Sequence, residues 1–103
     1  MKTVAVTGAT GFVGQVTLDR LVEAGWNVRA LTRRDQPKKA GVNWVHGALD
    51  RPDSLTELCE GADAVLHIAG GATAPDASGF EAGNVAGTAN MLDAAKDAGI
   101  KRF

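Results

Sequence analysis

The sequence predicts an α/β fold with a parallel sheet, and three observations lead to this prediction. Short β-branched, apolar runs alternate with longer segments whose apolar residues recur at helical spacing. Glycines stand at the predicted ends of these segments, where the chain can turn. The fourth apolar run, Ala64–Ala69, is nearly continuous, as is typical of a strand buried on both faces. Right-handed crossovers between the strands then give the spatial order 3-2-1-4.

The predicted elements follow one another without a linker, repeat or low-complexity tract. Four runs have strand length: Lys2–Thr7, Trp26–Thr32, Val42–His46 and Ala64–Ala69. The stub Ile100–Phe103 is expected to start a fifth strand beside the fourth. Helices are expected over about Phe12–Ala24, from Pro52 to the stop at Gly61, and over about Phe80–Ala98. Arg33–Gly41 and Gly70–Gly79 are expected to be loops.

Each predicted helix has an apolar face that should be buried. The first helix has a stripe of Leu18, Leu21 and Val22, and the second has Leu55, Leu58 and Cys59. On the third we expect Val85, Ala89, Leu92 and Ala95 to share the buried face. Asp50 precedes Pro52 and is expected to cap the second helix.

Length, composition and charge set limits on what the chain can do. Its 103 residues predict one domain, residues 1–103, with 45% apolar and 22% charged residues. The formal net charge of −1 gives no electrostatic footprint for nucleic acid or a membrane surface. The single Cys59 excludes an internal disulfide, and we find neither a signal peptide nor an apolar run of membrane-spanning length. These features favour a cytoplasmic protein.

The stretch Thr7–Gly14 organises the rest of the chain, because a predicted strand must turn there directly into a helix. Gly8, Gly11 and Gly14 occupy this turn. The first glycine permits a tight turn, the second lets a pyrophosphate approach the backbone, and the third lets the helix pack close to the strand. The helix N-terminus then presents N–H groups to an anion. We therefore expect the turn to bind a dinucleotide through Gly8, Thr10, Gly11, Phe12, Val13 and Gly14; the alternative is a plain glycine turn.

The spacing Gly-x-x-Gly-x-x-Gly in Thr7-Gly8-Ala9-Thr10-Gly11-Phe12-Val13-Gly14 resembles the extended and atypical short-chain dehydrogenase/reductases, the NAD-dependent epimerase/dehydratase group. The resemblance continues to the last residue and covers the N-terminal part of that family's fold. It implies a Rossmann-like sheet that ends before the second half.

The end of the second strand, Thr32-Arg33-Arg34-Asp35, bears on which cofactor is chosen. NAD-selective folds place an acid about 20 residues after the glycines, on the ribose 2′-hydroxyl. Here Thr32 stands in that place, and Arg33 or Arg34 could donate to a 2′-phosphate. We therefore expect NADP, with Arg33 the better candidate, although Asp35 leaves NAD possible. The alternative is two solvated arginines on a loop.

Three further segments resemble the family's cofactor site. In His46–Asp50 the resemblance implies a backbone contact from Leu49 to adenine, while Ala48 replaces the family's Asp. For the segment after the fourth strand, the resemblance implies that the backbone of Ala69 and Gly70 packs closely on the cofactor ribose. Asn84 begins a stretch similar to the family's Asn-Val-x-Gly-Thr-x-Asn helix, in which that Asn braces the backbone. His67, His46 and Cys59 are interpreted as packed core residues.

The chain contains no tyrosine, so the Tyr-x-x-x-Lys pair on which the family's redox chemistry depends is not in it. We predict no catalytic residue and no metal site in these 103 residues. Three interpretations remain: a cofactor-binding fragment of an oxidoreductase or epimerase, a non-catalytic NAD(P)-sensing regulator, or a bare folding unit. The apolar edge at the fourth or fifth strand predicts self-association with a second copy.

Overall fold

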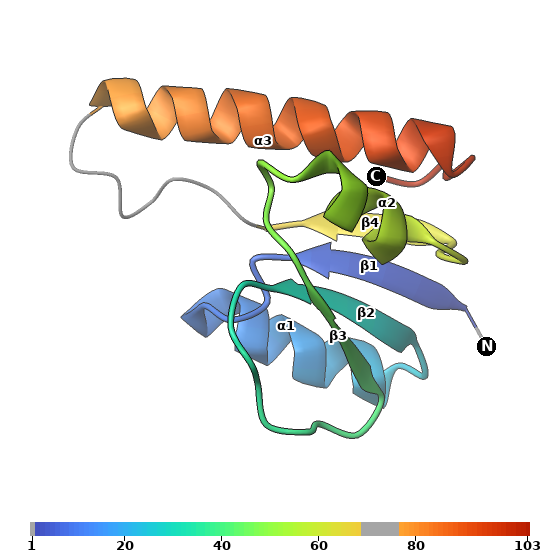
Figure 1. The fold of residues 1–103 in the computed structure, drawn as a ribbon. Helices are drawn as coiled ribbons and strands as arrows, with labels where there is room; N and C mark the ends of the chain where they lie inside the picture. The colour runs from blue at the N-terminus through green and yellow to red at the C-terminus, as the bar shows by residue number, and fades with distance from the viewer. Residues whose placement is uncertain (1, 69–76) are drawn as a thin grey trace.

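The computed structural model describes residues 2–68 and 77–103. Seven elements follow in chain order (Figure 1): β1 (Thr3–Thr7), α1 (Phe12–Glu23), β2 (Asn27–Thr32), β3 (Val42–His46), α2 (Pro52–Cys59), β4 (Ala64–His67) and α3 (Ala77–Asp97). The strands form one sheet in the order β3-β2-β1-β4, and all three pairings are parallel. The predicted strand order is therefore confirmed.

The predicted fifth strand is present as a single bridge. Arg102 pairs with Ala64 in parallel, and the Val65 N–H donates to the Arg102 oxygen at 2.9 Å. The stub thus lies beside β4, on the edge away from β1, as the sequence predicted.

Two apolar clusters pack against opposite faces of the sheet. α1 covers one face, where Leu18 lies in a cluster with strand residues such as Val6 and Val28. α2 and α3 lie together on the other face (Figure 1), where Leu55, Leu58 and Met91 are fully buried. The alternation along β1 explains this division, because neighbouring strand residues point to opposite faces.

Glycines end two helices as predicted. Gly25 has a φ of 90°; its N–H donates to the Val22 oxygen, and the Trp26 N–H donates to the Leu21 oxygen, both at 3.0 Å. This pair of bonds satisfies carbonyls that the helix leaves open. Gly99 ends α3 with the same pattern.

Two predictions about α3 are wrong. The helix begins at Ala77, three residues before the predicted Phe80. Ala95 is buried as predicted, together with Met91 and Ala94, but Leu92 is 46% exposed and Ala89 is also exposed, so these two do not belong to the buried face. Small apolar residues surround this helix on several sides, so helical periodicity does not select one face. Val85 belongs to the part of the helix whose side chains are not described.

Candidate dinucleotide-binding site

The turn between β1 and α1 has the geometry that its three glycines predicted. Gly8 adopts a φ of 75°, which residues with a side chain rarely adopt. A Cβ at Gly14 would lie 2.0 Å from the Gly8 oxygen and 2.6 Å from Ala9 Cα, so only glycine allows this close packing. A Cβ at Gly11 would have its nearest neighbour, the Gly8 oxygen, at 3.8 Å. Gly8 and Gly14 thus serve the fold, and Gly11 leaves room for a ligand.

The N-terminus of α1 borders this turn. Gly11 is its N-cap, and within the described residues no side chain caps the helix or places an acid in its first turn. The side chains of Phe12 and Val13 are 87% and 63% exposed. The first N–H groups of a helix have no partner within it, and the helix dipole favours negative charge there. This end of α1 therefore suits a phosphate.

A surface hollow joins the glycine turn to the end of β2. It has a volume of about 470 Å³ and is lined by Thr10, Thr32, Arg33, Arg34 and Gln36. The structure thus brings Thr10 together with both arginines. Thr32, where an acid would stand in an NAD-selective site, is buried, and its hydroxyl donates to the Arg34 oxygen at 2.6 Å. That bond holds the tight turn which presents the arginines.

Asp35 follows the arginines but has a partner on β3. His46 Nε2 lies 2.6 Å from Asp35 Oδ1, and both side chains are exposed. The interpretation of His46 as a packed core histidine is therefore wrong. It ends an edge strand with its ring in solvent, where the Asp35 carboxylate is its partner.

The loop from β3 to α2, which contains Leu49, is fixed by three elements. The Gly47 N–H donates to the Thr32 oxygen of β2 at 3.0 Å. Ser54 Oγ of α2 accepts from the Ala48 N–H at 3.2 Å, and Asn90 Nδ2 of α3 donates to the Leu49 oxygen at 2.7 Å. Leu49 therefore occupies a defined position beyond the carboxyl end of β3.

The predicted cap at Asp50 is wrong. α2 has Arg51 at its N-cap, without a capping side chain among the described residues, and Pro52 follows at the first helical position. Ser54 lies inside the first turn and donates back to the Arg51 oxygen at 2.7 Å. Because Ser54 already joins this turn to the preceding loop, Asp50 stays exposed at the surface.

His67 ends β4 beside the end of β1. Its Nδ1 lies 2.6 Å from Thr7 Oγ1, and its Nε2 lies 3.0 Å from Thr88 Oγ1 of α3. His67 is half-buried and both ring nitrogens have partners, so it is a packed histidine, as predicted, and burial lowers the pKa of its imidazole. Burial also raises the pKa of the Cys59 thiol, although the Arg29 charge opposes that shift. The predicted contacts at Ala69 and Gly70 lie outside the described residues.

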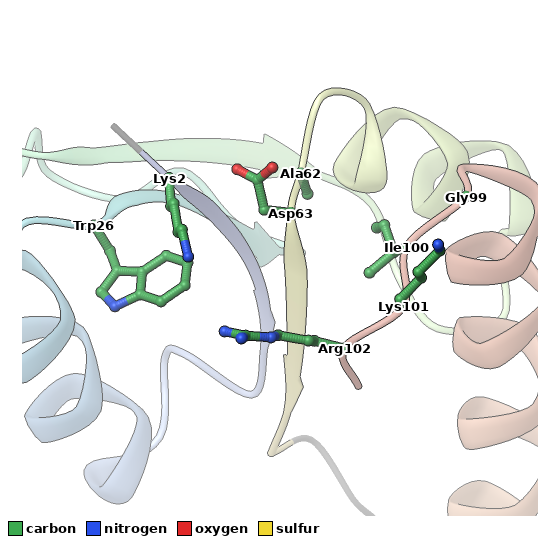
Figure 2. A pocket seen from close by; sticks show the side chains of 8 residues that line it. All are labelled: Lys2, Trp26, Ala62, Asp63, Gly99, Ile100, Lys101 and Arg102. Carbon is green, nitrogen blue, oxygen red and sulfur yellow. The ribbon is translucent and has the colours of Figure 1, made fainter.

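A second pocket lies at the opposite end of the sheet (Figure 2). It measures about 350 Å³ and is lined by the start of β1, the start of β4 and the end of the chain, including Lys2, Trp26, Asp63 and Arg102. Asp63 Oδ2 accepts from the Thr3 N–H at 2.8 Å, so this carboxylate already has a backbone partner. Ligands of open parallel sheets bind beyond the carboxyl ends of the strands. This pocket is therefore separate from the glycine turn.

The described residues offer neither a metal site nor a membrane-spanning helix. Across residues 2–68 and 77–103, no three His, Cys, Asp or Glu side chains gather as a metal site would require. The helices within those ranges are also too short or too polar to cross a bilayer.

Sequence reasoning missed three side chains that organise this region: Ser54, Thr88 and Asn90. Each is a small polar residue on a helix; Ser54 bonds to the loop just before its own helix, whereas Thr88 and Asn90 bond to segments distant in sequence. For Thr88 and Asn90 the signal was the resemblance of the stretch from Asn84 to the family's Asn-Val-x-Gly-Thr-x-Asn helix, in which we assigned a bracing role to Asn84 alone. Its polar members instead reach the loop after β3 and the end of β4.

Comparison with known proteins decides the family. A family model described as the NAD dependent epimerase/dehydratase family matches residues 4–103. This chain belongs to that family. Ceramide reductase of Caulobacter vibrioides is 37% identical over 102 residues, which are 95% of this chain and 32% of the reductase. L-arabinose 1-dehydrogenase (NAD(P)(+)) of Haloferax volcanii is 39% identical over 106 residues, 100% of this chain and 39% of the dehydrogenase.

Solved structures agree with this assignment. Uronate dehydrogenase from Agrobacterium tumefaciens superposes with a TM-score of 0.82 at 26% identity, over 96% of this chain and 38% of that one. A short-chain dehydrogenase/reductase superfamily protein from the same organism, with bound NAD, gives 0.80 at 37% identity, over 98% and 31%. The chain therefore has a Rossmann-like α/β fold, and it spans about a third of the length of these relatives.

Proposed function

We propose that this chain binds a nicotinamide dinucleotide, with the pyrophosphate on the turn from Gly8 to Gly14. The observation that carries the proposal is that the three glycines have different roles. Gly8 adopts the positive φ of the turn, Gly14 lets α1 pack against the backbone of Gly8 and Ala9, and Gly11 borders open space. In this arrangement the N–H groups of Phe12 and Val13 point toward the anion, and Thr10 lines the adjoining hollow. That two of the similar solved structures hold NAD supports the choice of a nicotinamide dinucleotide as the ligand.

The rest of the ligand extends along the carboxyl ends of the strands. The adenosine ribose lies beside the hollow at the end of β2, and adenine meets the loop after β3 at Leu49. The nicotinamide end lies beyond the carboxyl end of β4. In open parallel sheets, ligands bind in the crevice at the point where the strand order reverses, and here that point is at β1.

Arg33 and Arg34 favour NADP over NAD in this proposal. Both line the hollow, and an arginine can donate charge-assisted hydrogen bonds to a 2′-phosphate. Asp35, the acid that would favour NAD, has its carboxylate against His46. A charge-assisted hydrogen bond from an arginine to the 2′-phosphate would contribute about 1.5–3 kcal/mol, or about 10- to 100-fold in affinity.

We further propose that residues 1–103 form one folding unit and supply the cofactor-binding part of an oxidoreductase or epimerase. The dinucleotide supplies hydride transfer when it is bound. This chain's residues bind and orient it, and with no tyrosine the chain lacks the family's acid/base pair. A non-catalytic regulator that senses NAD(P) is the second candidate, because binding alone would suffice for that role.

Calorimetric titration of the 103-residue chain with NADPH and NADH tests this function. We expect NADPH to bind more tightly. Arg33→Ser should weaken NADPH about 10-fold or more and change NADH little. Arg20→Ser, which removes the same charge from the exposed far end of α1, is the matched control. Equal losses for both cofactors in Arg33→Ser would contradict the assigned role, and failure of both to bind a folded chain would contradict the proposed function.

A further inference from the structure

One turn of α3 lies directly behind the loop that follows β3. Asn90 Nδ2 donates to the Leu49 oxygen at 2.7 Å. Three residues earlier, a Cβ at Gly87 would lie 3.0 Å from Leu49 Cδ1. α3 therefore contacts both the backbone and the side chain of Leu49, the residue nearest the expected adenine.

This turn of α3 is itself fixed to the sheet. Thr88 bonds to His67 of β4 at 3.0 Å, and His67 bonds to Thr7 of β1 at 2.6 Å. Met91 is fully buried between the helix and the sheet. A helix turn held at these points is a rigid support, so a hydrogen bond from Asn90 sets where the loop lies relative to the glycine turn.

The rest of the loop is held at its two ends. At its start, the Gly47 N–H bonds to β2 and the Ala48 N–H bonds to Ser54 of α2; at its end, Ser54 Oγ donates to the Arg51 oxygen. A Cβ at Gly47 would lie 2.1 Å from Ser54 Cβ, so the start of the loop is tightly packed. The middle of the loop is held by a residue distant in sequence, since Asn90 donates to the Leu49 carbonyl. Removal of this bond would free the middle of the loop while both ends stay in place.

We propose that Asn90 and Gly87 are positioning residues for the adenine end of the dinucleotide site. Asn90 holds the Leu49 peptide by its carbonyl, and the missing side chain at Gly87 gives Leu49 its place. Neither residue touches the ligand in this proposal; both act through Leu49. The inference rests on the proposed function, because it assumes that adenine lies against this loop.

The test compares two probes that reach different parts of the site: ADP, which has the adenine, and inorganic pyrophosphate, which has only the group expected at Gly11. Asn90→Leu keeps a similar side-chain size and removes the donor. We expect its dissociation constant for ADP to rise about 5- to 10-fold, as for one lost hydrogen bond, with pyrophosphate affinity within about 2-fold. Asn43→Leu, at an exposed position on β3, is the control.

Gly87→Ala provides a second variant that should remain folded, because alanine favours a helix interior over glycine. We expect unchanged or higher thermal stability together with weaker ADP binding, a combination that loss of structure would not produce. Unchanged ADP affinity in both variants, or equal losses for ADP and pyrophosphate, would overturn the inference alone. A wild-type chain that binds neither probe would overturn the proposed function, and the inference with it.

Discussion

Gly14→Ala and Gly11→Val should separate the role of the glycine turn in folding from its role in binding. At Gly14 the new methyl carbon would lie 2.0 Å from the Gly8 oxygen and 2.7 Å from the Ala9 carbonyl carbon. These are backbone atoms, so no side chain can rotate to relieve the contact. Overpacking of this kind costs about 3 kcal/mol, which lowers the melting temperature of a domain of this size by roughly 12–24 °C.

At Gly11 an added side chain meets open space. The nearest atom to an added Cβ is 3.8 Å away, and the φ of −77° suits any residue. The cost of Gly11→Val is therefore that of a poor N-cap, about 1 kcal/mol, or roughly 4–8 °C. The valine would occupy the proposed place of the pyrophosphate, and we expect about a 100-fold loss of NADPH affinity, equivalent to one or two lost charge-assisted bonds.

Thermal melts followed by circular dichroism, with calorimetry on the variants that remain folded, would measure both effects. The expected pattern is a large loss of stability for Gly14→Ala and a large loss of binding for Gly11→Val. A Gly14→Ala variant that melts within a few degrees of wild type, or a Gly11→Val variant that retains wild-type affinity, would contradict these roles of the two glycines.

Three other predictions follow from single contacts. Arg29 donates to the Leu58 and Glu57 oxygens at the end of α2; Arg29→Met should cost about 1.5–3 kcal/mol in urea denaturation, and a smaller loss than 0.5 kcal/mol would contradict this role. The lowered pKa of His67 means that the unfolded chain binds more protons just below pH 6.5, so stability should fall as pH drops through that range and level off below the folded pKa; a His67→Gln variant with the same pH dependence would exclude this source. Leu66, 37% exposed on edge strand β4, should favour dimers that Leu66→Lys prevents; a wild-type monomer by sedimentation would contradict this.

The strand order and the glycine turn could be predicted because their causes are local. β-branched runs, glycines at fixed spacing and a following apolar stripe each determine a short piece of chain, and the parallel order follows from the crossovers. The contiguity of Thr10 with Arg33 and Arg34 in one hollow was foreseeable for the same reason, since all three follow the carboxyl ends of neighbouring strands.

The features that the sequence did not predict depend on contacts between distant segments. The exposed His46 acquires its partner from a loop eleven residues earlier. Asn90 bonds to Leu49 across 41 positions, and the spacing of apolar residues does not predict such a bond. The buried face of α3 was misassigned because alanines and glycine on several sides of the helix leave its orientation to the sheet that it packs against.

A backbone NMR titration of the 103-residue chain with NADPH would show whether the glycine turn holds the dinucleotide. We expect the largest amide shifts at Gly11, Phe12 and Val13, with further shifts at Arg33 and Leu49. Shifts confined to the opposite pocket around Lys2 and Arg102, or no shifts in a folded sample, would contradict it.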